Sequence, residues 1–241
     1  MPTPPIDRDK LRVFVRKLGS DEQFDLLDRA IDLLPASKLA SFVQGYARPA
    51  ELRADGPAAV AVLAAVQAFH GASLRGDYYQ DFRVNSRNFT RLSEGTRTWI
   101  AECERLMGLC VGAARGEEHA AVREAFELLF DLLCELDEGS DAIVFFADEG
   151  GSWQVDVRWE SVLPAWFRCL AATAAPEEYA TLAHGMIEFF AHHQAQELLP
   201  RALSVADTAQ RAALAQLPPP RQSPRRPIFA VADRQRARMR T

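Results

Sequence analysis

The sequence lacks the features that mark secreted and membrane proteins. Its first ten residues, "MPTPPIDRDK", contain no apolar run after a basic segment. No later window holds about 18 uninterrupted apolar residues, the length that a membrane-spanning helix needs. These two absences argue against a signal peptide and against a transmembrane helix. The sequence therefore predicts a cytoplasmic protein with no membrane partner.

Cysteine is scarce, and its spacing excludes the common uses of thiols. The chain has four cysteines, and no two of them form a CxxC pair that would suggest zinc. Cys103 and Cys110 on one helix would lie roughly 10 Å apart, at a rise of about 1.5 Å per residue. That separation is too long for a disulfide. We predict buried, reduced thiols at Cys103, Cys110, Cys134 and Cys169, and no cofactor.

The motifs of several large enzyme classes are also absent. The chain has no GxSxG nucleophile elbow, and no GxGxxG or GxxxxGK[ST] phosphate loop. The zinc motif HExxH is missing as well. Instead, "HGMIEFFAHH" places His184, Glu188 and His192 at successive four-residue steps, where the two histidines stand about 12 Å apart along a helix. We interpret them as ordinary residues of a helix flank, and these absences favour a protein that is not an enzyme.

Charge is unevenly distributed along the chain. The net charge of −5 combines a net of −11 over residues 1–216 with a net of +6 over residues 217–241, which hold seven arginines and one aspartate. The basic segment is rich in proline and arginine and cannot bury enough apolar surface to fold alone. We therefore predict a helical domain over 1–216 followed by a disordered basic tail over 217–241.

The tail is open to three interpretations. Arginine clusters bind phosphate, which suits nucleic acid. They can equally dock on an acidic body, of the same chain or of another copy, or remain solvated. The apolar residues Ile228, Phe229 and Val231 would then anchor the tail in a groove. Docking or solvation is favoured, because the acidic body repels phosphate outside the tail.

The fold class follows from helical periodicity. Hydrophobic residues make up 48% of the chain, enough for a sizeable core. Ser20 with Gln23 forms a predicted capping box, and apolar residues then recur at helical spacing from Phe24 to Leu34. Residues 56–74 are apolar on almost every side, which predicts an enclosed central helix. Helices at 94–114 and 117–136, with a short link, predict an antiparallel hairpin.

Residues 75–92 interrupt this periodicity but keep their aromatic side chains. A loop of this length that holds Tyr78, Tyr79, Phe82 and Phe89 must pack on something. It is either a strap over the helical body or a binding loop in which arginines stand among aromatics. We favour the strap, and we note that a boundary between two helical bundles could fall here.

A second interruption predicts a small β-hairpin near 142–158. Apolar residues 143–146 form a short β-prone run, and "DEGG" supplies turn residues. Trp153, Val155 and Val157 then alternate with polar neighbours. Asp148 and Glu149 would lie at the tip of this hairpin.

Seven carboxylates surround the predicted hairpin. Hard cations such as magnesium prefer oxygen ligands of this type, but the spacing is not that of an EF-hand loop. Glu160 falls in the first turn of a helix, where its charge meets the positive end of the helix dipole. We therefore favour solvated turns and caps over a metal site. The group consists of Asp137, Glu138, Asp141, Asp148, Glu149, Asp156 and Glu160.

Three further helices follow, in "WESVLPAWFRCLAATA", "PEEYATLAHGMIEFFAHHQ" and "QELLPRALSVADTAQRAALAQL". Over roughly residues 160–216 the chain resembles helical repeat proteins of the HEAT and tetratricopeptide type. Its bias towards Ala, Leu and Arg is similar to that of uncharacterised helical proteins from GC-rich bacteria. The resemblance implies stacked helices, and it carries no diagnostic motif, activity or site. The predicted class is mainly α, a helical bundle or a short α-solenoid with one small β-hairpin near 142–158.

These patterns predict a non-catalytic protein-interaction module, of the adaptor, chaperone-like or immunity type. Stacked helices offer grooves, and an acidic surface with a separate basic tail offers charge-selective contact with another protein. The alternatives are a metal-dependent hydrolase that uses the carboxylates at 137–160, and nucleic-acid binding through the tail. The predicted partner-binding residues are Asp148, Glu149, Arg225, Arg226, Phe229, Arg236 and Arg238.

Overall fold

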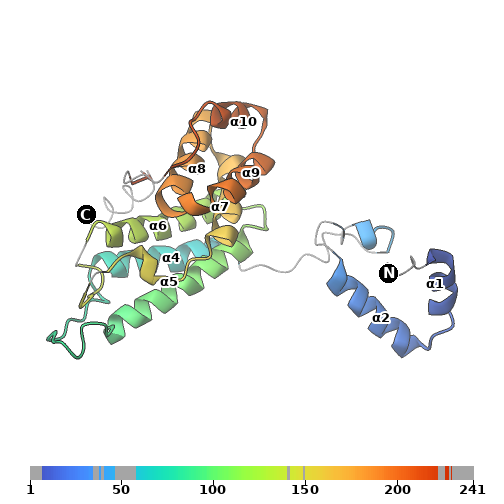
Figure 1. Cartoon of the computed structure of the whole chain (residues 1–241), viewed down its shortest axis with the longest axis horizontal. Coiled ribbons are helices and arrows are strands. Elements are labelled where there is room, and N and C mark those ends of the chain that lie inside the picture. The colour runs from blue at the N-terminus through green and yellow to red at the C-terminus, as the bar shows by residue number, and fades with distance from the viewer. Residues whose placement is uncertain are drawn as a thin grey trace, which may run out of the picture. The chain divides into compact units, whose positions relative to one another are not determined.

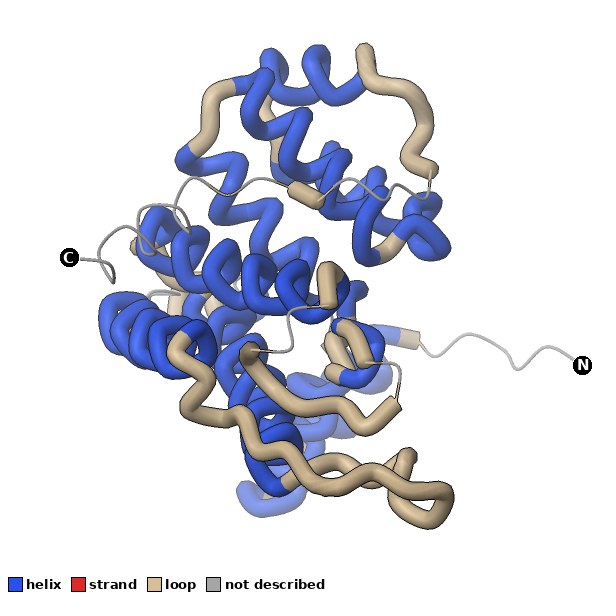
Figure 2. The backbone as a smooth tube through the Cα atoms, turned by 90° about the vertical axis from the view of Figure 1, so that its left-hand side faces the viewer, coloured by secondary structure: helices blue, strands red, loops and turns tan. Residues whose placement is uncertain are grey.

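The protein divides into two units, Met1–Ala54 and Asp55–Thr241, in a computed structural model (Figure 1). The described residues are 7–34, 38, 41–46, 58–139, 142–148, 150–221, 226, 227 and 229. Their regular structure consists of α-helices and two short 3-10 helices, and this part of the chain contains no strand (Figure 2). The predicted mainly α class is confirmed.

The first unit contains α1 (Arg8–Val15) and α2 (Ser20–Leu33). The Asp7 carboxylate begins α1 by accepting hydrogen bonds from two backbone amides of the first turn, each at 2.9 Å. At α2 the predicted N-cap is wrong by one residue. Gly19 is the N-cap, and its amide donates to the Glu22 carboxylate (2.9 Å). The Gln23 side chain instead donates to the carbonyls of residues 15 and 18, which closes the turn between the helices.

The second unit is built around α6 (His119–Asp137), which packs on three other long helices. On one side lie α4 (Ala59–Leu74) and α5 (Glu94–Ala113), and on the other lies α7 (Trp159–Thr173). The remaining helices pack around α7 and on one another (Figure 1). They are α8 (Pro176–Phe190), α9 (Ala195–Val205) and α10 (Thr208–Ala215), with the 3-10 helices η2 (Ser152–Gln154) and η3 (His192–Gln194).

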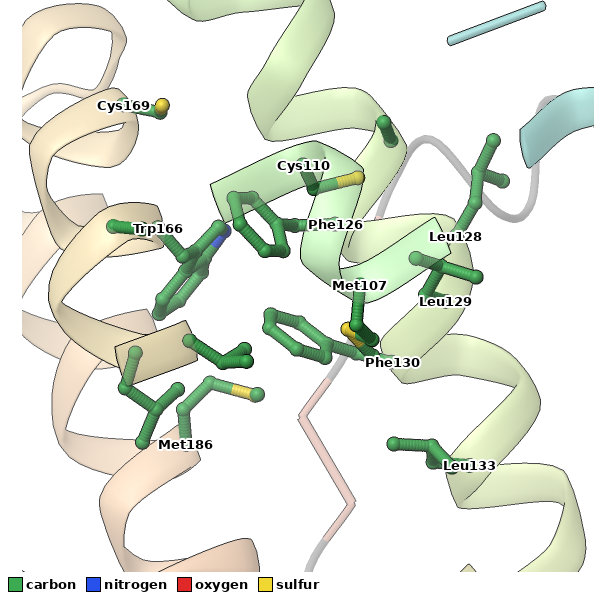
Figure 3. Close-up of a cluster of buried hydrophobic side chains, with 14 of the residues drawn as sticks. Met107, Cys110, Phe126, Leu128, Leu129, Phe130, Leu133, Trp166, Cys169 and Met186 are labelled. Atoms are coloured by element: carbon green, nitrogen blue, oxygen red, sulfur yellow. The ribbon is translucent and has the colours of Figure 1, made fainter. Parts of the chain in front are cut away.

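The core surrounds α6 on most of its sides. Four apolar residues at helical spacing on α6 are all fully buried, and they are Val122, Phe126, Leu129 and Leu133. Residues on the other faces of the helix are buried as well, Phe130 among them. Its ring meets that of Trp166 from α7 edge to face, with centroids 5.6 Å apart (Figure 3). Because α6 touches neighbours on several sides, it connects α4 and α5 with α7.

The apolar helix α4 is less enclosed than its composition suggests. Val62, Val66 and Phe69 face the core, whereas Val60 is 63% exposed. The prediction of a helix enclosed on all sides is therefore wrong, because α4 lies at the edge of the helix group and packs mainly on α5 and α6. Within the described residues, no helix is both long and apolar enough to span a bilayer.

The aromatic loop at 75–92 packs on the second unit. The ring of Tyr78 lies 5.5 Å from that of Phe69 on α4. Tyr79 and Phe82 both contact Phe145, at 6.0 and 5.2 Å between ring centroids. These contacts support the interpretation of the loop as a strap. The division between the two units falls at Ala54 and Asp55, and the strap belongs to the second unit.

The predicted β-hairpin near 142–158 is wrong for the described residues of that range. Residues 142–148 run as turn and loop, and η2 takes the place of the second strand. Neighbouring Ile143 and Val144 are both buried, so the period of two that a strand requires is broken. The carboxylate of Asp137 accepts hydrogen bonds from the amide and hydroxyl of Ser152, which stabilises the 3-10 turn instead.

Candidate functional site

The C-terminal segment lies against the helical body at its described positions, which are 217–221, 226, 227 and 229. We call these positions the C-terminal segment. His184 on α8 donates from Nε2 to the Pro218 carbonyl at 2.6 Å. The backbone amide of Arg221 donates to the Glu188 carboxylate at 3.2 Å. The first part of the segment is therefore fixed along α8 by two polar contacts.

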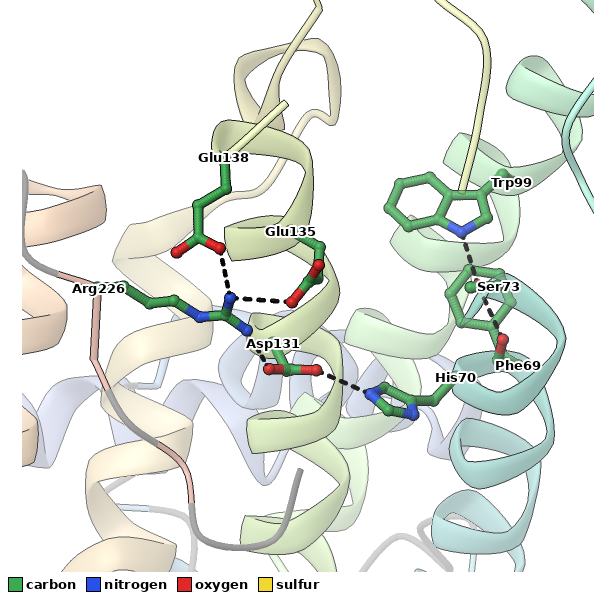
Figure 4. A network of polar contacts seen from close by, with 8 residues as sticks. All are labelled: Phe69, His70, Ser73, Trp99, Asp131, Glu135, Glu138 and Arg226. Atoms are coloured by element: carbon green, nitrogen blue, oxygen red, sulfur yellow. Dashed lines mark hydrogen bonds and ion pairs between the residues drawn. The ribbon is translucent and has the colours of Figure 1, made fainter. Parts of the chain in front are cut away.

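Arg226 makes the strongest polar contact of this segment. Its guanidinium pairs with three carboxylates that recur along one side of α6 (Figure 4). It contacts Asp131, and it lies 2.9 Å from Glu135 and 2.8 Å from Glu138. The spacing of four and three residues places these acids on one helical face, which we call the acidic face of α6.

The charge of Arg226 is well compensated in this position. Burial opposes a charged guanidinium, but the hydrogen bond to Glu135 and the charge of Asp131 outweigh it and raise the Arg226 pKa above its ordinary value. A guanidinium held by three carboxylates has little remaining capacity for a phosphate. At Arg226, the contact therefore favours a tail that docks on the helical body over a tail that binds nucleic acid.

Asp131 connects the tail to the interior. One carboxylate oxygen contacts Arg226, and the other accepts a hydrogen bond from His70 Nε2 on α4 at 3.0 Å (Figure 4). The Asp131 and His70 side chains are only 3% and 0% exposed. The three residues form a buried chain of polar contacts from α4 through α6 to the C-terminal segment.

Phe229 completes the docking with an apolar contact. It is 4% exposed, and its ring lies 6.1 Å from that of Phe130. Phe130 also contacts Trp159 and Phe190, whose rings stack with centroids 4.7 Å apart. Phe229 thus joins an aromatic cluster formed by α6, α7 and α8.

The predicted partner-binding residues do not form one site. Arg226 and Phe229 lie in the docked segment. Asp148 is exposed and lines a pocket of about 260 Å³ near the 75–92 loop, together with Arg91 and Trp153. The remaining predicted residues fall outside the described part of the chain, so their role stays a prediction. They are Glu149, Arg225, Arg236 and Arg238.

The carboxylates at 137–160 are spread over separate contacts where they are described. Asp137 caps η2, Glu138 pairs with Arg226, and Glu160 stands in the first turn of α7. The backbone amide of Asp156 donates to Glu104 on α5. Across the described residues, no group of three or more His, Cys, Asp or Glu side chains is placed to hold a metal ion.

The other sequence candidates have structural partners. His184 lies 3.4 Å from Glu188 on α8, and both contact the C-terminal segment. His192 lies in η3, because α8 ends at Phe190, and it does not continue the helical face. The regular spacing of these three residues therefore ends with the helix.

A larger pocket of about 450 Å³ lies between α5, the loop at 156–158 and α7. Its volume is in the range of small-molecule sites. Glu104, Asp156 and Arg158 are its charged residues, and the Asp156 amide is already bonded to Glu104. Apart from Ser161, the other residues that line it are apolar or glycine.

Many exposed apolar side chains lie in the first unit, where the sequence predicts a helix with apolar residues at helical spacing from Phe24 to Leu34. On α1, Leu11 and Phe14 are 45% and 58% exposed. On α2, Phe24 is 64% exposed, and Leu27 and Ile31 are 42% and 40% exposed. The signal was present in the sequence as two amphipathic helices in a segment too short to form a core of its own.

Comparison of this chain with protein-family models, with curated proteins and with solved structures finds no match.

Proposed function

We propose that this protein is a non-catalytic protein-interaction module, whose docking surface is the apolar face of α1 and α2. One observation carries the proposal. Most large apolar side chains of the second unit are collected in a core, with exposed exceptions such as Val60 and Trp153, whereas several of those on the short helices α1 and α2 stand in solvent. Large contiguous apolar surfaces on soluble proteins mark interaction sites.

The spacing of the exposed residues supports a docking surface. Phe24, Leu27 and Ile31 recur at three and four residues and lie on one side of α2. Aromatic and large aliphatic side chains supply most of the free energy at protein interfaces. Since these side chains are already exposed in the free chain, little rearrangement is needed before a partner binds.

The closed second unit is proposed to act as the folded body of the module. Its described polar clusters are engaged in ion pairs between its own elements, such as Arg226 with the acidic face of α6. All four cysteines are free and buried. Together with the compositional bias, this supports our proposal of a bacterial protein that works in a reducing cytoplasm.

The test is retention of partners from a lysate that contains both tagged and untagged copies of the full chain, after nuclease treatment. We expect a stoichiometric protein, either a second copy or another protein, to be retained by the wild type. The variant F14S/F24S should lose it, because each substitution removes an exposed aromatic side chain from the docking face. The variant V60S is the matched control, since Val60 is equally exposed but lies on α4.

Two results would reject this function. The first is that no protein, including a second copy, is retained by the wild type. The second is that F14S/F24S retains the same proteins as V60S, which would place the docking surface elsewhere.

A further inference from the structure

Exposed apolar side chains form a stripe on each of α1 and α2, while Val13, Leu26 and Leu33 are exposed on other sides of these helices. On α1, Leu11 and Phe14 stand three residues apart. On α2 the stripe runs through Phe24, Leu27 and Ile31. At 100° per residue, each set falls within one side of its helix. Both helices therefore present a face that is built to pack on another helix.

This surface is not covered within the described residues of the first unit. Exposed large side chains occur on both helices, up to Leu33 at the end of α2 with 85% exposure, and again after them at Tyr46 with 95% exposure. A unit of this size buries too little surface to be stable alone without added helices. The two stripes therefore need a partner that supplies helices or an equivalent apolar surface.

The two helices carry net charges of opposite sign, and this difference indicates which kind of partner would fit them. Residues 7–18 carry five basic and two acidic residues, a net of +3. Residues 19–34 carry five acidic residues and one basic residue, a net of −4. The first unit thus consists of a basic helix followed by an acidic helix, and a surface with this arrangement is complementary to itself under two-fold symmetry.

The charged positions adjoin the apolar stripes. Exposed Lys10 and Arg12 stand on either side of Leu11, and Arg12 also pairs with Asp9 of its own helix. Aspartates recur in the sequence at 21, 25, 28 and 32, with the spacing of four, three and four that follows one flank of a helix. Charges beside an apolar seam determine which helices pair.

We propose that α1 and α2 pair with α2 and α1 of a second copy of this chain, in a two-fold four-helix bundle. Each basic helix would then lie against an acidic helix of the other copy, and both apolar stripes would be covered. The inference rests on the proposed function, since it uses the same face and specifies its partner.

The second unit of the same chain fits this role less well. Residues 55–241 carry 25 acidic and 19 basic residues, a net of −6. An acidic body attracts α1 but repels α2, whereas a second copy matches both helices. An unrelated protein would need its own basic and acidic helices in the same order.

The experiment measures the oligomeric state of the full chain by sedimentation velocity over a range of concentrations. Wild type and V60S should form dimers, and F14S/F24S should be monomeric at the same concentrations. Charge reversal then tests the pairing itself. The variants K10E/R12E and D25K/D28K should each dimerise at least tenfold more weakly than wild type, because like charges then face one another across the seam.

Mixing the two charge-reversed variants distinguishes pairing between copies from pairing within one chain. In an equimolar mixture, the glutamates at 10 and 12 of one variant meet the lysines at 25 and 28 of the other, and the one remaining contact pairs an unchanged acidic α2 with an unchanged basic α1. We expect a heterodimer with affinity close to wild type. The combined variant K10E/R12E/D25K/D28K should dimerise again by itself, and circular dichroism verifies that each variant keeps its helices.

The inference is overturned if the wild type is monomeric throughout, or if neither the mixture nor the combined variant restores dimers. A monomeric wild type that still retains another protein through Phe14 and Phe24 would reject the second copy but leave the proposed function standing. A monomer that retains no protein through these residues would reject both.

Discussion

At the scale of single residues, Asp131 and Arg226 join the C-terminal segment to the helical body. Asp131 is buried on α6. One of its carboxylate oxygens accepts a hydrogen bond from His70, and the other accepts one from Arg226. Taking one partner away from a buried charge leaves that charge uncompensated in a low-dielectric surrounding. The contact with the tail is therefore important for the stability of the body.

Replacing Arg226 by methionine should lower the free energy of unfolding by about 3 kcal/mol, the cost of breaking a buried ion pair. The substitution keeps much of the side-chain volume and removes only the charge and its hydrogen bonds. Urea denaturation followed by circular dichroism measures the change. The control is R221M, which should stay within about 0.5 kcal/mol of wild type because Arg221 is exposed and bonds Glu188 through its backbone. Equal stability of R226M and R221M would contradict the buried pair.

The cysteines illustrate how burial controls reactivity. Burial raises the pKa of Cys110 to about 12 and that of Cys169 to about 11, and it also raises the pKa values of Cys103 and Cys134. A raised thiol pKa means that little reactive thiolate exists at neutral pH.

We expect a disulfide reagent such as DTNB to modify none of the four thiols of the folded protein within minutes, at pH 7 or pH 9. Both pH values lie below the raised pKa values, so the thiolate fraction stays small across this window. In guanidinium chloride all four thiols should react. One fast equivalent in the folded protein would show that a thiol is accessible.

At the scale of elements, the start of α5 depends on a glycine. A Cβ atom at Gly95 would lie 2.1 Å from the carbonyl oxygen of Tyr78 in the strap, and the Gly95 amide donates to Gln80 (3.0 Å). Only a residue without a side chain allows the strap to approach α5 so closely. Gly108, on the same helix, has no atom within 4 Å of its would-be Cβ.

The variant G95A should therefore lower the free energy of unfolding by about 1 to 3 kcal/mol, the usual cost of overpacking. G108A is the matched control and should raise stability by up to about 1 kcal/mol, because alanine favours the helix over glycine. Thermal denaturation of both variants checks the sign. A stabilised G95A would mean that the strap does not pack on α5.

At the scale of the whole molecule, the two units differ in how they are stabilised. The second unit has a continuous core that includes residues from Ala59 to Phe229. The described helices of the first unit expose the apolar residues that would form a core. Local stability follows from buried contacts, so the first unit should open more readily than the second when it is unpaired.

Hydrogen exchange of the full chain should show this difference. Amides of α6 should be strongly protected at every protein concentration, because they lie in the closed core. Protection of α1 and α2 should rise with concentration, since pairing with a second copy covers their apolar faces. F14S/F24S should remove the concentration dependence. Equal protection of both units in dilute wild type would contradict the assignment of α1 and α2 as an uncovered surface.

The mainly α class follows from local patterns in the chain, and so do the approximate limits of α5 and α6, which were predicted at 94–114 and 117–136. Helices can be read from sequence because their hydrogen bonds join residues four apart, so that periodicity and capping residues carry the information. The sequence also predicted that the strap must pack on the body, from its aromatic residues.

Which residues are buried and which charges meet became clear only from the packing of the helices. Trp153 alternates with valines as a strand residue would, yet it lies within the 3-10 helix η2 and is 70% exposed. Arg226 meets Asp131 across a separation of 95 residues, a pairing that no local pattern reveals. Burial and ion pairing depend on which distant elements pack together, whereas helix formation depends mainly on near neighbours.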